Sequence, residues 1–314
     1  MLFAKRLFQA LTGSSSSGPP AQVPMAHAKQ MLASLLTMAW FVEARDPYTG
    51  GHLWRVSRYA YLLARQVGMD DADAAKVSLG AFLHDIGKIG VPDDVLRKPS
   101  RLTEAEFSVI QTHPNVGRRM ISGHPLSGLV EDAVYLHHER PDGKGYPLGL
   151  SGEQIPMMAR VVGICDAFDA MTSHRPYRPG MSKEAALAIL QSARGSQFDD
   201  ELVGYFLVLA EQGALEHVLG HSDDAIPLQM CPMCGPTLVI QRGYLAGRRI
   251  YCRSCSGQFT LVPTAKGLQA ESTGVTGDAK DLEPALDADL IRRVVGQAAE
   301  HLAAQDLLEG LVFD

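Results

Sequence analysis

Helical periodicity runs almost unbroken from residue 25 to residue 220 of this sequence. Apolar residues recur there at spacings of three and four, and strictly alternating patterns are nearly absent before residue 236. Glycine and proline lie between successive periodic stretches. These features predict an all-α domain over residues 25–220, with helices joined by loops. The helices are expected at residues 25–46, 52–68, 71–85, 103–112, 114–122, 126–138, 156–171, 182–194 and 199–211.

A second, smaller module is predicted at residues 221–262, where the pattern changes. This stretch is rich in glycine, β-patterned, and holds two Cys-x-x-Cys pairs, Cys231 with Cys234 and Cys252 with Cys255. Two such pairs in a β context are typical of one zinc ion held by four thiolates, as in a zinc ribbon. A thioredoxin-like redox site would need a single pair at a strand-to-helix junction. We therefore expect one structural zinc ion, which would stabilise a module too small to fold on its own core.

The sequence leaves the role of this zinc-ribbon-like module open. Arg242, Arg248, Arg249 and Arg253 make it locally basic, which would allow contact with nucleic acid. The whole chain is acidic, with a formal net charge of −6. That balance argues against nucleic acid as a partner and favours a structural or protein-binding role.

The remaining segments have the composition of linkers or of a single helix. Residues 1–24 are expected to form a flexible N-terminal segment, residues 263–283 a linker, and residues 284–314 an amphipathic helix that reaches about residue 309. No apolar run approaches the roughly 20 residues that span a bilayer. The cysteine pattern suits a reducing compartment. We therefore expect a cytoplasmic protein with no membrane partner.

Histidines and aspartates at the ends of apolar helices are the candidate functional residues. His84 and Asp85 follow a helix that would bury them, and a buried carboxylate is unfavourable unless it is paired or binds a cation. An isolated pair of this kind is usually structural. Here further candidates stand at other helix ends, and a mixture of imidazole and carboxylate suits first-row metal ions. They are His52, His113, His137, His138 and Asp166.

These residues lie in motifs that resemble one known family. The motifs are "DPYTGGH" (46–52), "LHDIGKIGVPD" (83–93), "THP" (112–114), "HHERPDGKGYP" (137–147) and "DAFDAMTSHRPYR" (166–178). In this order they are similar to HD-GYP domains, the branch of the HD superfamily associated with cyclic di-GMP hydrolysis. The resemblance covers residues 35–215 and implies a multi-helix HD-type bundle, followed here by the zinc-ribbon-like module and the C-terminal helix.

The resemblance implies a site for two divalent ions, iron, manganese or a similar metal. It assigns the ligands shared across the superfamily to His52, His84, Asp85 and Asp166, and the additional ligands of this branch to His113, His137 and His138. Asp85 would bridge the two ions, because one carboxylate offers two oxygens. Some family members hold a third ion through a glutamate just before the first histidine. The stretch "ARDPYTGG" lacks that glutamate, although Glu43 lies upstream, so two ions are expected.

Such a site implies hydrolysis of a phosphodiester. Two neighbouring divalent ions lower the pKa of a bridging water, and the resulting hydroxide can attack phosphorus in line. Asp85 and Lys88 are the predicted catalytic residues, with Lys88 holding a non-bridging phosphate oxygen. For the two arginines of "SHRPYRPG" a salt bridge that anchors the loop is the alternative to substrate contact. The candidate substrate contacts are Lys88, Arg140, Asp142, Lys144, Tyr146, Arg175 and Arg178.

The predicted function is metal-dependent hydrolysis of cyclic di-GMP to pGpG, with onward hydrolysis to GMP left open. One alternative is another HD-type nucleotide phosphohydrolase. The added histidines and the loop around Gly145, Tyr146 and Pro147, called the GYP loop, argue against it. The other is a catalytically weak adaptor that senses cyclic di-GMP or binds diguanylate cyclases, meeting their GGDEF domains through the GYP loop. The complete ligand set argues against this adaptor. A homodimer formed through the first or the final helix is also open.

Overall fold

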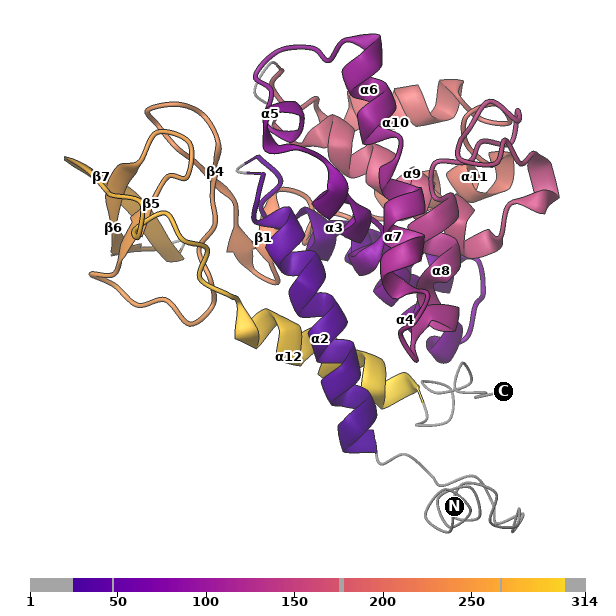
Figure 1. Ribbon diagram of the computed structural model, residues 1–314, viewed down its shortest axis with the longest axis horizontal. Coiled ribbons are helices and arrows are strands. Elements are labelled where there is room, and N and C mark those ends of the chain that lie inside the picture. Colours follow the sequence, from indigo (N-terminus) through magenta and orange to yellow (C-terminus); the bar gives the residue numbers. More distant parts are fainter. Residues whose placement is uncertain (1–24, 47, 175–177, 266, 303–314) are drawn as a thin grey trace, which may run out of the picture.

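The structure, a computed structural model, describes residues 25–46, 48–174, 178–265 and 267–302. A helical domain is followed by small antiparallel sheets and a last helix (Figure 1). The mainly α fold class with a small β-rich module is thereby confirmed. The helices are α2 (Met25–Glu43), α3 (His52–Gln66), α4 (Asp71–Leu83), η1 (Ile86–Gly90), α5 (Asp93–Leu96), α6 (Glu104–Ile110), α7 (His113–Ile121), α8 (Ser127–Leu136), η2 (Gly152–Gln154), α9 (Met157–Thr172), α10 (Lys183–Ser192), α11 (Asp200–Glu211) and α12 (Ala288–His301).

Side-chain caps fix where several of these helices begin. Asp70 accepts a hydrogen bond from a first-turn N–H of α4, and Asp199 does the same for α11. Thr103 and Glu106 form a reciprocal capping box at the start of α6. Each cap satisfies N–H groups that the first turn of a helix leaves unpaired. The polar residue ahead of each apolar stretch therefore sets the start of the helix.

The two largest apolar clusters of the described residues hold the helical domain together. In the first, α3, α9 and α11 pack around Tyr59, whose ring centroid lies 5.3 Å from that of Phe168 and 6.3 Å from that of Phe206, edge to face. In the second, leucines of α2 and α4 and valines of α8 pack in one cluster with Ile291 and Val295 of α12. Figure 1 shows α12 beside α2, far from it in sequence. The last helix thus completes the core of the helical domain.

The β-rich module consists of three small antiparallel sheets. Strand β1 pairs with β2, β3 pairs with β4, and β5, β6 and β7 form a three-stranded sheet in that order. Phe259 and Leu261 of β6 pack with Leu238 and Ile250 into a core that includes two of the cysteines. The strands are β1 (His221–Asp223), β2 (Ile226–Pro227), β3 (Gln229–Met230), β4 (Thr237–Leu238), β5 (Arg249–Tyr251), β6 (Gly257–Thr264) and β7 (Gly267–Thr276).

The structure differs from the sequence-based expectation at the expected linker 263–283. Strand β7 occupies Gly267–Thr276 within it, and its side chains are mostly exposed. Within the described residues β7 pairs on one side only, with β6. An edge strand without a covered face has no apolar alternation, so its composition resembles that of a linker.

The last helix begins later than the expected residue 284. Helix α12 begins at Ala288, because the Asp287 side chain accepts a hydrogen bond from Leu290 N and caps the helix there. Residues 303–314 and the expected N-terminal segment 1–24 lie outside the described residues. Among the helices that are described, none is long and apolar enough to cross a bilayer.

Candidate metal centre

Several helix ends converge on one buried site in the helical domain. The side-chain donor atoms of His52, His84 and Asp85 lie within 4.8 Å of one another, and so do those of His113, His137 and His138. These residues stand at the start of α3, the end of α4, the start of α7 and the end of α8, and Asp166 joins them from within α9. The structure therefore brings all seven predicted ligands together.

Asp85 lies between the two groups. Its Oδ2 is 3.3 Å from His84 Nε2 and 3.6 Å from His52 Nε2, while its Oδ1 is 3.4 Å from His113 Nε2. Asp166 Oδ1 is 3.5 Å from His52 Nε2. The two oxygens of Asp85 thus face different histidines, which is what a carboxylate needs in order to bridge two cations.

Hydrogen bonds on the far side of the rings orient four of the histidines. Nδ1 of His84, His113 and His137 lies 2.6, 2.8 and 2.7 Å from a backbone carbonyl three or four residues earlier. Nδ1 of His52 lies 2.7 Å from Asp169 Oδ2. Because these acceptors require a proton on Nδ1, the lone pair is on Nε2, which faces the cluster.

His84 provides the test of whether a cation fits. The residue is fully buried and its Nε2 makes no hydrogen bond, although an Asp85 oxygen lies 3.3 Å away. A buried nitrogen lone pair without a partner is unfavourable unless it binds a cation. Imidazole nitrogens with carboxylate oxygens are a donor set that suits first-row divalent ions. The side chains present therefore fit divalent metal ions.

The protonation states of the cluster also favour a bound cation. Burial lowers the pKa of His113 to about 4 and that of His138 to about 3, so both rings are neutral near pH 7. Burial also opposes a proton on His84, but the charges of Asp85 and Asp166 raise its pKa to about 10, so without a metal ion a proton occupies the Nε2 position that the ion would take. Although burial opposes ionisation of Asp85, His84 and Lys88 hold its pKa well below the usual range. Fixed carboxylate charge beside neutral imidazoles favours a bound cation.

The ion pair between Arg55 and Asp169 was missed by sequence reasoning. Both side chains are buried, with Arg55 Nε 2.6 Å from Asp169 Oδ1 and Nη2 2.9 Å from Oδ2. The spacing of Asp166 and Asp169 was an available signal, because it places two carboxylates on one face of an apolar helix. The partner lies 114 residues earlier in the chain, however, and no local pattern reveals it.

Part of the GYP loop lines a cavity beside the cluster. Its volume is about 390 Å³, and Arg140, Lys144 and Tyr146 line it together with His138 and Asp166. The Tyr146 ring lies against that of His138, with 4.7 Å between centroids. These three predicted substrate contacts are therefore next to the candidate metal ligands.

The other predicted contacts lie elsewhere. Lys88 Nζ is 2.5 Å from Asp85 Oδ2, outside the lining of this cavity. Asp142 accepts two hydrogen bonds from Arg140, at 3.0 and 2.7 Å, and stabilises the loop. Arg178 donates hydrogen bonds to the carbonyls of Ala170 and Met171 near the end of α9. These bonds fit a residue that anchors its loop better than one that contacts substrate. Arg175 lies outside the described residues.

Sequence reasoning also missed the role of Glu139. It is buried, and its carboxylate accepts hydrogen bonds from the backbone N–H groups of Leu148, Gly149 and Leu150. A carboxylate next to two candidate ligands was a visible signal, but it suggested a further ligand more readily than a loop anchor. Glu139, next to His138, therefore holds the backbone that follows Pro147 close to the metal centre.

The four cysteines of the β-rich module form a separate candidate site. Sγ of Cys231 lies 3.7 Å from Sγ of Cys255 and of Cys234, and Cys234 Sγ lies 3.5 Å from Cys252 Sγ. A zinc–sulfur bond of about 2.3 Å places the corners of a tetrahedron about 3.8 Å apart. The spacing of the sulfurs is therefore that of a tetrahedral four-thiolate zinc site.

An all-α domain whose helix ends bring histidines and aspartates to one buried centre is an HD-type domain. A family model described as "HD domain" matches residues 36–202, more than half of the chain, and the chain belongs to this family. The HD-GYP branch is indicated by the GYP loop, which packs against the centre through Tyr146, and by relatives that are named cyclic di-GMP phosphodiesterases.

Three of these relatives illustrate the likeness. The chain is 41% identical to the cyclic di-GMP phosphodiesterase response regulator RpfG of Xanthomonas campestris pv. campestris, over 61% of this chain and 51% of that protein. It is 39% identical to the 3'3'-cGAMP-specific phosphodiesterase 3 of Vibrio cholerae, over 58% and 40%. It is 40% identical to a cyclic di-GMP phosphodiesterase of Pseudomonas aeruginosa, over 53% and 40%. The chain thus spans about half, or less, of the length of these relatives.

Proposed function

We propose that this chain is a metal-dependent phosphodiesterase that hydrolyses cyclic di-GMP to pGpG. The observation that carries the proposal is the convergence of imidazole Nε2 atoms on Asp85, with the buried Nε2 of His84 left without a hydrogen bond. The names of two of the relatives support cyclic di-GMP as the substrate. The name of the third supports 3'3'-cGAMP as the second candidate substrate.

Two divalent ions, iron or manganese, are assigned to the centre in this proposal. Their ligands would be His52, His84, Asp85, His113, His137, His138 and Asp166. When bound, such ions supply positive charge to a phosphodiester and make a coordinated water acidic enough to attack it. Asp85 would hold both ions through its two oxygens.

The remaining residues would bind and orient the substrate. The Lys88 ammonium group pairs with Asp85 at the edge of the centre and is suited to a non-bridging phosphate oxygen. Arg140 and Lys144 offer positive charge to the dinucleotide from the cavity wall, and Tyr146 offers a ring face and a hydroxyl. The Arg140–Asp142 ion pair keeps that wall in place.

The other assignments of the proposal concern the whole chain. We place one structural zinc ion at the four cysteines, and the cytoplasm as the compartment in which those thiols stay reduced. The exposed residues of the GYP loop, Lys144 and Leu148, are the surface on which we expect a GGDEF-domain protein to bind. The sequence-based division into residues 25–220 and 221–262 remains part of the proposal.

The decisive experiment uses purified full-length chain reconstituted with manganese or iron. We expect cyclic di-GMP to be converted to pGpG, about two metal ions per chain beyond one zinc, and loss of both in Asp85→Ala. Asp94→Ala, at an exposed aspartate nearby, is the matched control and should behave as wild type. Faster hydrolysis of 3'3'-cGAMP would reassign the substrate. Tight nucleotide binding with no turnover under either metal would indicate the adaptor.

A further inference from the structure

The β-rich module touches the helical domain at the residues just before the first candidate ligand. A Cβ atom added at Gly50 would lie 2.4 Å from Val239 Cγ2, and one added at Gly51 would lie 2.6 Å from Ser222 Cα. Gly51 also has a φ of +75°, which favours glycine. Glycine is needed at Gly51, where the facing atom is backbone, and at Gly50 any larger residue would have to displace the Val239 side chain.

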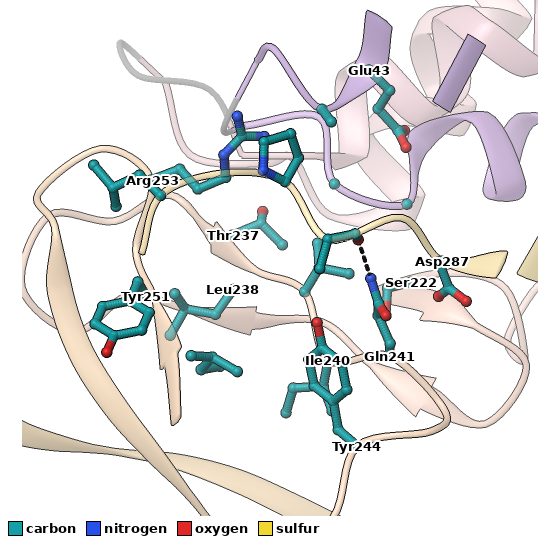
Figure 2. Close-up of a pocket in the computed structure, with 18 of the residues that line it drawn as sticks. Glu43, Ser222, Thr237, Leu238, Ile240, Gln241, Tyr244, Tyr251, Arg253 and Asp287 are labelled. Atoms are coloured by element: carbon teal, nitrogen blue, oxygen red, sulfur yellow. Dashed lines mark hydrogen bonds between the residues drawn. The ribbon is translucent and has the colours of Figure 1, made fainter. Parts of the chain in front are cut away.

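Beside this contact, residues of the two parts line a shared cavity of about 350 Å³. Figure 2 shows Glu43 of α2 on one side and Thr237, Leu238 and Ile240 of the module on the other. Gly50 and Gly51 also line this cavity. The module therefore touches the helical domain beside His52, and Arg293 of α12 makes a separate contact, an ion pair with Asp223 of β1.

A chain of hydrogen bonds continues from the module into the metal centre. His221 O, on β1, accepts a hydrogen bond of 3.0 Å from Arg55 Nη1, which also donates to Gly50 O at 3.0 Å. The same guanidinium pairs with Asp169, and Asp169 Oδ2 lies 2.7 Å from His52 Nδ1. A carboxylate behind a ligating histidine fixes its tautomer and ring orientation. Arg55 and Asp169 are positioning residues for His52, and β1 supplies one of their partners.

The shape of the module depends on its four cysteines. Strand β4 follows Cys234 after two residues, and Cys231 and Cys252 are part of the core that buries Leu238. Ser254, between the last two cysteines, lies beside the phenol of Tyr48, four residues before His52. So small a core gains most of its folding free energy from the bound ion.

We propose that the four-cysteine module is a positioning element for the metal centre of the helical domain. With its thiolates bound to zinc, β1 and β4 hold Gly50, Gly51 and Arg55 in place, and His52 Nε2 is thereby aimed at Asp85 and Asp166. Loss of the ion from the module releases this support and weakens metal binding at the HD centre. The inference deepens the proposed function, but its test does not depend on hydrolysis.

The first test adds a methyl group at the contact between the module and the helical domain. Full-length chain carrying one zinc per chain is titrated with Mn²⁺, and free Mn²⁺ is followed by electron paramagnetic resonance. Gly50→Ala should weaken Mn²⁺ binding about tenfold, the lower end of the effect of disturbing a ligand's supporting shell. Gly243→Ala, at an open position in the same module, is the matched control and should bind as wild type.

A double-mutant cycle then tests whether the methyl group added at residue 50 clashes with Val239 of the module. Val239→Ala removes the methyl group that the new Cβ would strike, so the pair Gly50→Ala/Val239→Ala should regain most of the lost affinity. Normal Mn²⁺ binding by Gly50→Ala, or no recovery in the pair, would overturn the proposal.

The second test removes the module's own ion. Cys252→Ser combined with Cys255→Ser should lose zinc and also bind Mn²⁺ at least about tenfold more weakly at the HD centre. Unchanged Mn²⁺ affinity in this variant would contradict the inference. If all variants bind Mn²⁺ as expected but wild type hydrolyses no cyclic dinucleotide, the proposed function fails and the positioning role stands.

Discussion

The direction of each candidate ligand is set by an atom on the far side of its ring. Three histidines use backbone carbonyls three or four residues earlier in the chain, and His52 uses Asp169. The local sequence is enough for the first arrangement, because a histidine at a helix end meets carbonyls that have lost their helical partners. The second needs Arg55 and Asp169, which are joined only by the tertiary fold.

Histidine burial gives the metal-free protein a pH dependence in the acidic range. The folded-state pKa of His113 is about 4, below its ordinary value of 6.5. As the pH falls below 6.5, the unfolded chain takes up a proton on His113 before the folded protein does. The free energy of unfolding is therefore unaffected by His113 above pH 6.5 and falls by up to about 3 kcal/mol as the pH approaches 4. The raised pKa of His84 acts at higher pH and does not enter this window.

The measurement is urea unfolding of metal-free protein between pH 7 and 4. We expect the free energy of unfolding to fall less steeply with acid in His113→Gln than in wild type. His217→Gln, at an exposed histidine, serves as the control and should keep the wild-type slope. Equal slopes in all three proteins would show that His113 is not held neutral by burial.

Glu139 anchors the GYP loop through three backbone N–H groups. Glu139→Gln removes the charge and replaces one acceptor oxygen with a donor, so we expect a loss of about 1–3 kcal/mol in stability. In steady-state kinetics the KM for the cyclic dinucleotide should rise more than kcat falls, because the loop wall moves while the metal ligands stay. Glu153→Gln, at an exposed glutamate, should change neither quantity. A fall in kcat alone would argue for a direct role of Glu139 in the reaction.

At the scale of elements, helix positions followed from the sequence better than strand positions. Helices α3, α4 and α11 lie where apolar spacing and capping residues placed them, within a few residues. Strand β7 did not, because an edge strand with exposed side chains carries no alternation. The short helix η1 was also missed, although its residues lie inside a motif, because five residues are too few to show a period.

The close packing of η1 on α7 makes Gly87 a sensitive position. A Cβ at Gly87 would lie 1.9 Å from His113 O and 2.4 Å from Gly117 N, so the two elements would have to separate. We expect Gly87→Ala to destabilise the fold by about 3 kcal/mol and to weaken Mn²⁺ binding by moving His113. Gly128→Ala, at an open glycine in α8, should be neutral or slightly stabilising in the same unfolding and binding measurements. Wild-type stability of Gly87→Ala would mean that η1 and α7 are less closely packed.

At the scale of the whole molecule, α12 belongs to the helical domain by packing and not by sequence. Ile291 and Val295 are buried among the leucines of α2 and α4. The amphipathic pattern predicted the helix, but it gave no information about which surface would cover it. That pairing depends on the path of the chain through the β-rich module, which local patterns do not encode.

Tryptophan fluorescence can test this assignment. The chain has two tryptophans, Trp40 and Trp54, and both lie in the helical domain. We expect Ile291→Ala to lower the urea midpoint of the tryptophan transition, corresponding to about 2–5 kcal/mol. Gln297→Ala, exposed on the same helix, should leave the midpoint unchanged. An unshifted transition in Ile291→Ala would make α12 an independent element.

The position of α12 against α2 also bears on how the protein is made in the cell. While the ribosome is still synthesising the β-rich module, α2 and α4 have emerged with part of their apolar surface uncovered, and only the segment up to Leu302 supplies the missing face. Ribosome-bound chains of this protein should therefore expose apolar surface for longer than their helical content suggests. They should also engage nascent-chain chaperones until translation has passed α12.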